Sequence, residues 1–181
     1  MNEIISIAIA NPNRLQKRFI STPLEAWMFL PISEEELQEA MASIGSADEF
    51  ADYYISEVET CGYEIALHCG DTIEELNEVA KRIAALQKAD YLEAMKLSAY
   101  LEAHPDLTLA EIHDLLDKGF DNYDLFVGLT SFQEFRKFCY AQDGEYAHLQ
   151  WELVYYLESE GKVQHCCEIY HTSVGTLIKN Q

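Results

Sequence analysis

Hydrophobic and polar residues are arranged in three short patterns that predict β-strands in the first third of the chain. Residues Ile4 to Ala10 form an apolar run, and Ala26 to Leu30 form a second one. Tyr54 to Glu59 alternates, which predicts a half-buried strand with its acids on the outer face. Between the last two segments, Ser33 and Glu36 have the spacing of a capping box, so a helix is expected to begin there.

The helix after Ser33 is predicted to be amphipathic. Its apolar positions recur at i, i+3, i+4 and i+7, and Gly45 supplies the stop signal. These core positions are Leu37, Ala40, Met41 and Ile44. The opposite face is acidic and carries Glu34, Glu35, Glu36 and Glu39. Residues 1–70 are therefore predicted to form an N-terminal α+β domain, a small sheet with one acidic helix.

Residues 71–120 are predicted to form a small helical bundle. Thr72-x-x-Glu75 and Thr108-x-x-Glu111 are capping boxes that open two helices. Residues 89–103 form another helix between them, which ends before Pro105 because the residue preceding proline is disfavoured in the α region. The connections are short, so neighbouring helices are expected to be antiparallel.

Residues 121–181 are predicted to form a C-terminal α+β domain. Tyr123 to Leu129 is a strand candidate, and Thr130-x-x-Gln133 is expected to cap a phenylalanine-rich helix. A helix over residues 145–160 and a final strand over residues 171–178 complete the prediction. The fold class is thus α+β, organised in three small domains.

The net charge of the chain limits the kinds of partner that it can bind. The chain of 181 residues has 32 Asp and Glu against 12 Lys and Arg, a formal net charge of −20. Hydrophobic residues make up 49% of it, so the chain can fold and is not an acidic disordered tail. Binding to DNA, RNA or an anionic membrane depends on cationic side chains, so these partners are excluded, which leaves a basic partner or no partner at all.

The acidic residues are also unevenly distributed. From Phe19 to Ala80 there is no Lys or Arg, yet fifteen Asp and Glu residues occur. Soluble surfaces ordinarily intersperse both signs to relieve repulsion. Two interpretations stay open on composition alone: an acidic surface that merely keeps the protein soluble, and one that binds a cationic partner.

The location predicted from the sequence is cytoplasmic. The first thirty residues lack the basic region and cleavage context of a secretory signal, and no apolar stretch approaches the ~20 residues of a membrane span. The five cysteines lack C-x-x-C spacing, which favours reduced thiols over a disulfide framework.

Catalytic signatures are missing from the sequence. It contains no GxGxxG, GxxxxGK[ST], HExxH or GxSxG motif. We therefore predict no enzyme activity, no cofactor and no metal.

Two groups of residues offer alternative metal-binding hypotheses. A cysteine and histidine cluster near the C-terminus is unfavourable because adjacent cysteines do not readily aim both sulfurs at one ion; its members are His165, Cys166, Cys167 and His171. The pair His113-Asp114 resembles the metal-binding dyad of HD-type phosphohydrolases. Further ligands would have to come from His68 or His104 and Asp124.

Several segments together resemble the ArdA antirestriction family. They are the Trp27–Pro31 element (WMFLP) leading into Ser33–Ala40 (SEEELQEA), then Asp48–Phe50 (DEF), Tyr53–Glu59 (YYISEVE) and Ile73–Ala80 (IEELNEVA). The resemblance covers about residues 26–125. It implies an elongated three-domain protein, a homodimer with much of its dimer contact in the third domain.

The resemblance also implies a function. Its carboxylates would imitate DNA phosphates and occupy the DNA-binding groove of type I restriction-modification enzymes, particularly the methyltransferase core, so protecting mobile DNA without catalysis. The residues expected to bind the partner are Glu34, Glu35, Glu36, Glu39, Asp48, Glu49, Asp52, Glu57, Glu59, Glu74, Glu75 and Glu78. The alternative is an acidic regulatory module of a mobile element that binds another basic protein.

Overall fold

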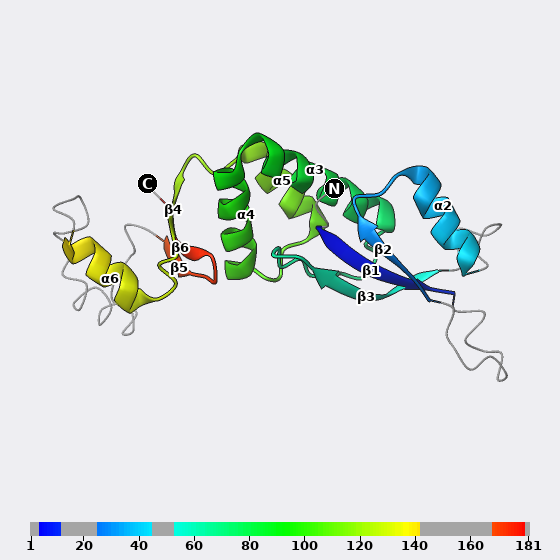
Figure 1. Cartoon of the computed structure of the whole chain (residues 1–181), viewed down its shortest axis with the longest axis horizontal. Helices are drawn as coiled ribbons and strands as arrows, with labels where there is room; N and C mark the ends of the chain where they lie inside the picture. Colours follow the sequence, from blue (N-terminus) through cyan, green and yellow to red (C-terminus); the bar gives the residue numbers. More distant parts are fainter. Residues whose placement is uncertain (1–3, 12–24, 45–52, 142–167, 180–181) are drawn as a thin grey trace. The chain divides into compact units, whose positions relative to one another are not determined.

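The computed structural model describes residues 4–11, 25–44, 53–141 and 168–179. Within them, helices and short antiparallel strands are mixed, so the predicted α+β class is confirmed (Figure 1). The elements in chain order are β1 (Ile5–Ala10), β2 (Glu25–Leu30), α2 (Glu34–Ser43), β3 (Tyr54–Thr60), α3 (Ile73–Ala89), α4 (Tyr91–Ala103), α5 (Leu109–Lys118), β4 (Tyr123–Val127), α6 (Phe132–Ala141), β5 (Glu168–His171) and β6 (Gly175–Lys179).

The chain forms two compact units. The N-terminal unit comprises Met1–Tyr91 and Asp106–Lys118, and the C-terminal unit comprises Leu92–Pro105 and Gly119–Gln181. Helices α3 and α5 belong to the first unit, whereas α4 from its second residue onward belongs to the second. The division into three domains and the elongated arrangement stay predictions.

The N-terminal unit is built on a three-stranded antiparallel sheet with the order β2-β1-β3. All six residues of β1 are buried, as expected for the central strand of an apolar run. Ile5, Ile7 and Ile9 share the inner face with Met28 and Leu30 of β2. Helices α2 and α3 contact β2, and α3 contacts α5, so the helices cover that face (Figure 1).

The three predicted capping boxes are all present. They join Ser33 with Glu36, Thr72 with Glu75, and Thr108 with Glu111. In the first box, the Glu36 backbone N–H donates to Ser33 Oγ at 3.3 Å, and the Ser33 backbone N–H donates to Glu36 Oε2 at 2.8 Å. Local sequence therefore determines where these helices begin. The predicted stop at Gly45 lies outside the described residues.

The first capping box gives a prediction about titration. Hydrogen bonds from the Ser33 backbone and hydroxyl lower the pKa of the exposed Glu36 from 4.5. A lowered carboxylate pKa stabilises the folded state above pH 4.5, and this contribution is lost as the pH falls through the folded pKa. We expect Ser33→Ala to raise the Glu36 pKa part of the way back and to cost about 1 kcal/mol at neutral pH. Carboxyl-carbon NMR titration and chemical denaturation measure the two effects.

Glu111 provides the internal control for that titration. The pKa of its carboxyl is lowered chiefly by hydrogen bonds from Thr108, which Ser33→Ala does not touch. Its titration should therefore be the same in both proteins. An unchanged Glu36 pKa in the variant would contradict the contribution assigned to the Ser33 hydroxyl.

The C-terminal unit contains a second sheet, with the order β4-β6-β5. The prediction of one strand over residues 171–178 is wrong, because β5 ends at His171 and β6 begins at Gly175, forming a hairpin. Thr172 closes the turn: its backbone N–H and its hydroxyl both donate to the Gly175 carbonyl, at 2.9 and 2.8 Å. The predicted helix over residues 145–160 lies outside the described residues.

The N-cap of α6 also differs from the prediction by one residue. Ser131, not Thr130, accepts from the backbone N–H of the third helical residue, Glu134, at 3.3 Å. The Glu134 carboxylate accepts in return from the Ser131 hydroxyl at 3.0 Å and from the Thr130 backbone N–H at 3.2 Å. A charged carboxylate is a stronger acceptor than the neutral Gln133 amide, which favours this register. The helix buries Phe135 against Ile178.

Candidate partner-binding surface

Helix α2 carries the first group of predicted acids on its solvent face. Leu37 and Met41 are buried, whereas every glutamate of the helix is exposed. Glu34, Glu35 and Glu36 lie in its first turn, where negative charge interacts favourably with the helix dipole. Helix formation and the acidic surface thus support each other.

Helix α3 presents the second group in the same way. Glu74, Glu75 and Glu78 are exposed, and Leu76 and Val79 are fully buried beneath them. Glu78 lies 3.8 Å from Lys81, but both side chains are more than half exposed. A pair of this kind is strongly solvated and contributes little.

The two helices come together at a groove of about 310 Å³. Its charged lining consists of Glu34 of α2 and of Glu74, Glu78 and Lys81 of α3. Asn77 fixes the arrangement: its side chain donates to the Ile32 carbonyl and accepts from the Ile32 backbone N–H, both at 2.9 Å. Carboxylates that are forty residues apart in the sequence therefore surround one concave surface.

Strand β3 places Glu57 and Glu59 elsewhere. Both are exposed on the face of the sheet that the helices do not cover, because they pair with Ala8 and Ser6 of β1 and not with its buried isoleucines. The predicted acids of the N-terminal unit thus occupy two faces, one formed by helices and one by the sheet.

Nine of the twelve predicted acids are described by the structure, and all nine are exposed. Two of them have a structural task as well, since Glu36 and Glu75 each use Oε2 in a capping box. The remaining three lie outside the described residues; they are Asp48, Glu49 and Asp52.

Some exposed residues of this unit were missed by the sequence reasoning. Glu25 and Glu64 are exposed acids of the base-free segment. Trp27, Phe29 and Tyr54 are exposed by 45%, 50% and 41%. The signal for the aromatic residues was present in β2, where Trp27 and Phe29 alternate with the buried Met28 and Leu30.

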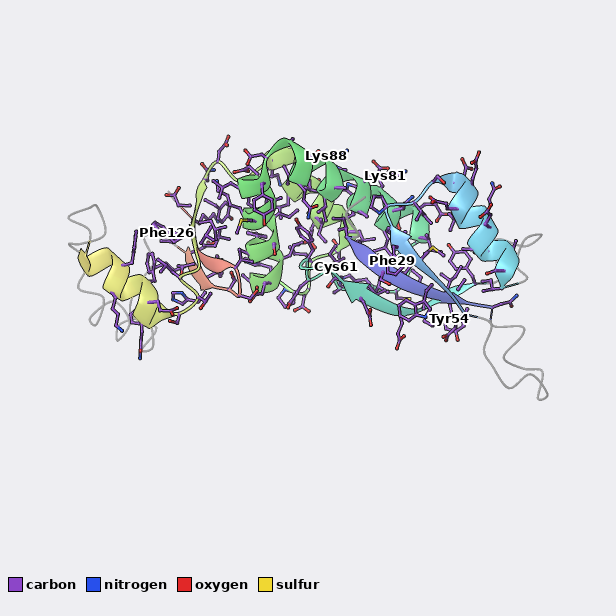
Figure 2. All side chains as sticks on the ribbon, in the orientation of Figure 1. Phe29, Tyr54, Cys61, Lys81, Lys88 and Phe126 are labelled. Carbon is purple, nitrogen blue, oxygen red and sulfur yellow. The ribbon has the colours of Figure 1, made fainter. Side chains whose placement is uncertain are left out.

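Basic side chains compensate this charge only slightly. The described residues of the N-terminal unit include seventeen Asp and Glu against four Lys and Arg. Arg82 is engaged within the unit, where it binds Asp117 and the ring of His113. Lys81 and Lys88 lie exposed on α3 (Figure 2). The unit therefore has a strong negative potential that would attract a cationic partner.

A comparison with protein families identifies this acidic chain. The model of the antirestriction protein (ArdA) family matches residues 22–168. The chain belongs to the ArdA family. A comparison with curated proteins finds no match. The resemblance inferred from the sequence is thereby confirmed, and membership implies an antirestriction protein that interacts with restriction-modification enzymes and does not act by catalysis.

The HD-type hypothesis finds no support in this ArdA-family chain. Within the described residues, no group of three or more His, Cys, Asp and Glu side chains is arranged to hold a metal ion. The Nδ1 atom of His113 accepts a hydrogen bond from Arg82 at 2.9 Å, and a guanidinium beside it disfavours a cation there. His104 stacks on Tyr100 with ring centroids 4.1 Å apart.

Two further points of the sequence analysis can be compared with the structure only in part. Of the cysteine and histidine cluster that the sequence disfavours as a metal site, His165, Cys166 and Cys167 lie outside the described residues, while His171 ends β5 and its Nδ1 atom forms a hydrogen bond with the Thr176 hydroxyl. Among the helices that the structure describes, none combines the length and apolar character that a membrane-spanning segment needs.

Proposed function

We propose that this protein inhibits type I restriction-modification enzymes by imitating B-DNA with its surface carboxylates. In this proposal it occupies the DNA-binding groove of the enzyme, particularly of the methyltransferase core, and so protects mobile DNA in the cytoplasm. The observation that carries the proposal is that the nine predicted partner-binding acids that the structure describes are all exposed, on a unit whose described residues include few bases.

The amount of charge is suited to this task. Duplex DNA carries one charge per about 1.7 Å of its axis, so twenty charges correspond to about 34 Å, or roughly ten base pairs. The chain has this excess of twenty negative charges. One protomer therefore matches about one helical turn, and a homodimer would imitate a longer stretch. We propose that residues 121–181 supply the dimer contact.

Competition with DNA tests this proposal. We expect the protein to bind a purified type I methyltransferase and to be displaced by unlabelled duplex containing the recognition sequence, because both would use one groove. Binding is expected to weaken steeply as salt is raised. Fluorescence anisotropy of the labelled protein measures displacement, and a restriction-protection assay measures inhibition.

The control in that assay is single-stranded DNA of the same length, which should displace the protein much less effectively. Binding that duplex DNA leaves intact would contradict the proposal. That result would instead favour the alternative, an acidic regulatory module that binds a basic protein outside a DNA groove.

A further inference from the structure

The open face of the β2-β1-β3 sheet has a repeated composition. Three cross-strand rows cover it, and each consists of a small residue on β1 between an aromatic residue on one edge strand and a glutamate on the other. The rows are Phe29–Ser6–Glu59, Trp27–Ala8–Glu57 and Glu25–Ala10–Tyr54. We call this surface the row face.

The central strand of the row face is buried, and the two edge strands carry its exposed side chains. Ser6, Ala8 and Ala10 are at most 3% exposed, whereas the flanking side chains of both edge strands are exposed. Phe29 on β2 and Tyr54 on β3 are labelled in Figure 2. The edge strands lie two strand spacings apart, about 9.6 Å. The small residues on β1 therefore lie beneath the flanking side chains, and the exposed part of each row is its aromatic ring and its carboxylate.

An irregularity in β3 completes the third row. The register with β1 shifts between Ala8 and Ile9, so Ser56 is the extra residue of a β-bulge. Its hydroxyl donates to the Ala8 carbonyl at 3.2 Å. Without the extra residue, Tyr54 and Glu57 would lie on opposite faces, because side chains alternate along a strand. The bulge places both on the row face.

The composition of the rows favours a cationic ligand. Exposed aromatic residues on a sheet commonly stack nucleic-acid bases, but the three glutamates of the row face would repel phosphates, and the rows contain no Lys or Arg. An arginine side chain satisfies both halves of a row, since its guanidinium stacks on aromatic rings and donates to carboxylates. Lysine satisfies this combination less well because its ammonium is compact and strongly hydrated.

We propose that the row face binds arginine side chains of a basic protein partner, with one guanidinium in each row stacking on the aromatic ring and donating to the carboxylate. The identification of that partner as a restriction-modification enzyme rests on the proposed function, whereas the preference for arginine does not. The row face adds short-range contacts that salt screens less than the long-range attraction of the acidic helices.

Model peptides test the preference without the enzyme. In a Trp151→Phe background, Trp27 is the sole tryptophan of the chain. We expect nona-arginine to change the Trp27 emission and to bind about threefold more tightly than nona-lysine at 0.15 M NaCl. The preference should persist at 0.5 M NaCl, where both peptides bind more weakly.

Variants of one row test whether its aromatic ring and its carboxylate bind the same guanidinium. By calorimetry, Phe29→Ala and Glu59→Gln should each weaken nona-arginine binding about fivefold, and together by less than the product of the two effects. The matched controls are Tyr91→Ala and Glu64→Gln, which change an exposed aromatic residue and an exposed acid away from the row face. These should each change binding less than twofold. Circular dichroism checks that all variants are folded.

Two results would overturn the inference. One is equal affinity for both peptides together with row-face variants that behave like their controls. The other is a Phe29→Ala variant that sediments as a smaller species than the parent protein, which would make the row face a contact between copies of this chain. If the protein prefers nona-arginine but duplex DNA does not displace the protein from the methyltransferase, this inference stands and the proposed function is refuted.

Discussion

We expect the combined substitutions Glu35→Lys, Glu39→Lys and Glu74→Lys to slow association with a type I methyltransferase about 100-fold. They reverse three exposed acids on the solvent faces of α2 and α3, which we call the helical surface. The reason for the slower association is electrostatic steering, which accelerates association by about 10- to 1,000-fold and depends on the charge facing the partner. The substitutions change the net charge from −20 to −14. The three side chains lie on solvent faces of α2 and α3, so the core packing beneath them is unchanged.

Stopped-flow binding at two salt concentrations measures this effect, and restriction protection reports its consequence. The matched control combines Asp106→Lys, Asp114→Lys and Asp121→Lys, which are exposed acids outside α2 and α3 and give the same net charge. If both triple variants slow association equally, total charge matters and the helical surface has no special role. Glu35 and Glu74 lie in first helical turns, so thermal unfolding is measured in parallel to detect loss of the dipole interaction.

The elements of the N-terminal unit could be predicted because their signals are local. A capping box involves residues three positions apart, and the hydrogen bonds of Ser33 with Glu36 form as the spacing predicts. The apolar run of Ile4 to Ala10 likewise predicts a strand, and the structure places that strand at the centre of the sheet with all six residues buried. In a capping box, both partners of the interaction lie within one short segment of the sequence.

The row face could not be predicted in the same way. The exposed side of β2 follows from alternation, but the pairing of Trp27 with Glu57 across Ala8 depends on strand register. The bulge at Ser56 changes that register by one residue, and no turn or spacing signal marks it. The groove lined by Glu34, Glu74 and Glu78 has the same origin, since it depends on how α2 and α3 pack.

The missed hairpin in the C-terminal unit has a different cause. Thr172 and Val174 have good strand propensity, so the pattern continues across the turn. Gly175 is the residue of this segment that could have indicated the break between the two strands. It is buried at the start of β6, where it pairs with Val127 of β4. Its lack of a side chain allows the two backbones to approach closely, which is a packing requirement and not a propensity.

Gly175→Ala is therefore expected to disrupt the second sheet. A Cβ atom at this position would overlap the Phe126 carbonyl oxygen and lie 3.0 Å from the Phe126 carbonyl carbon and from the Val127 Cα. These are backbone atoms, so relief requires β4 and β6 to separate. We expect a loss of about 3 kcal/mol, at the upper end of the range for overpacking. For a unit of this size, the corresponding fall in Tm is about 12–24 °C.

Gly128→Ala separates this clash from ordinary glycine strain in the same sheet. Gly128 follows β4 with a φ of 79°, yet a Cβ atom there meets nothing within 4 Å, so only the left-handed backbone opposes alanine. That strain costs about 1–2 kcal/mol. Denaturation and hydrogen exchange of the β6 amides should rank Gly175→Ala as the more damaging change, with protection lost first in β6. Equal destabilisation by the two substitutions would contradict the close approach of β4 and β6, because only Gly175 has backbone in the path of a side chain.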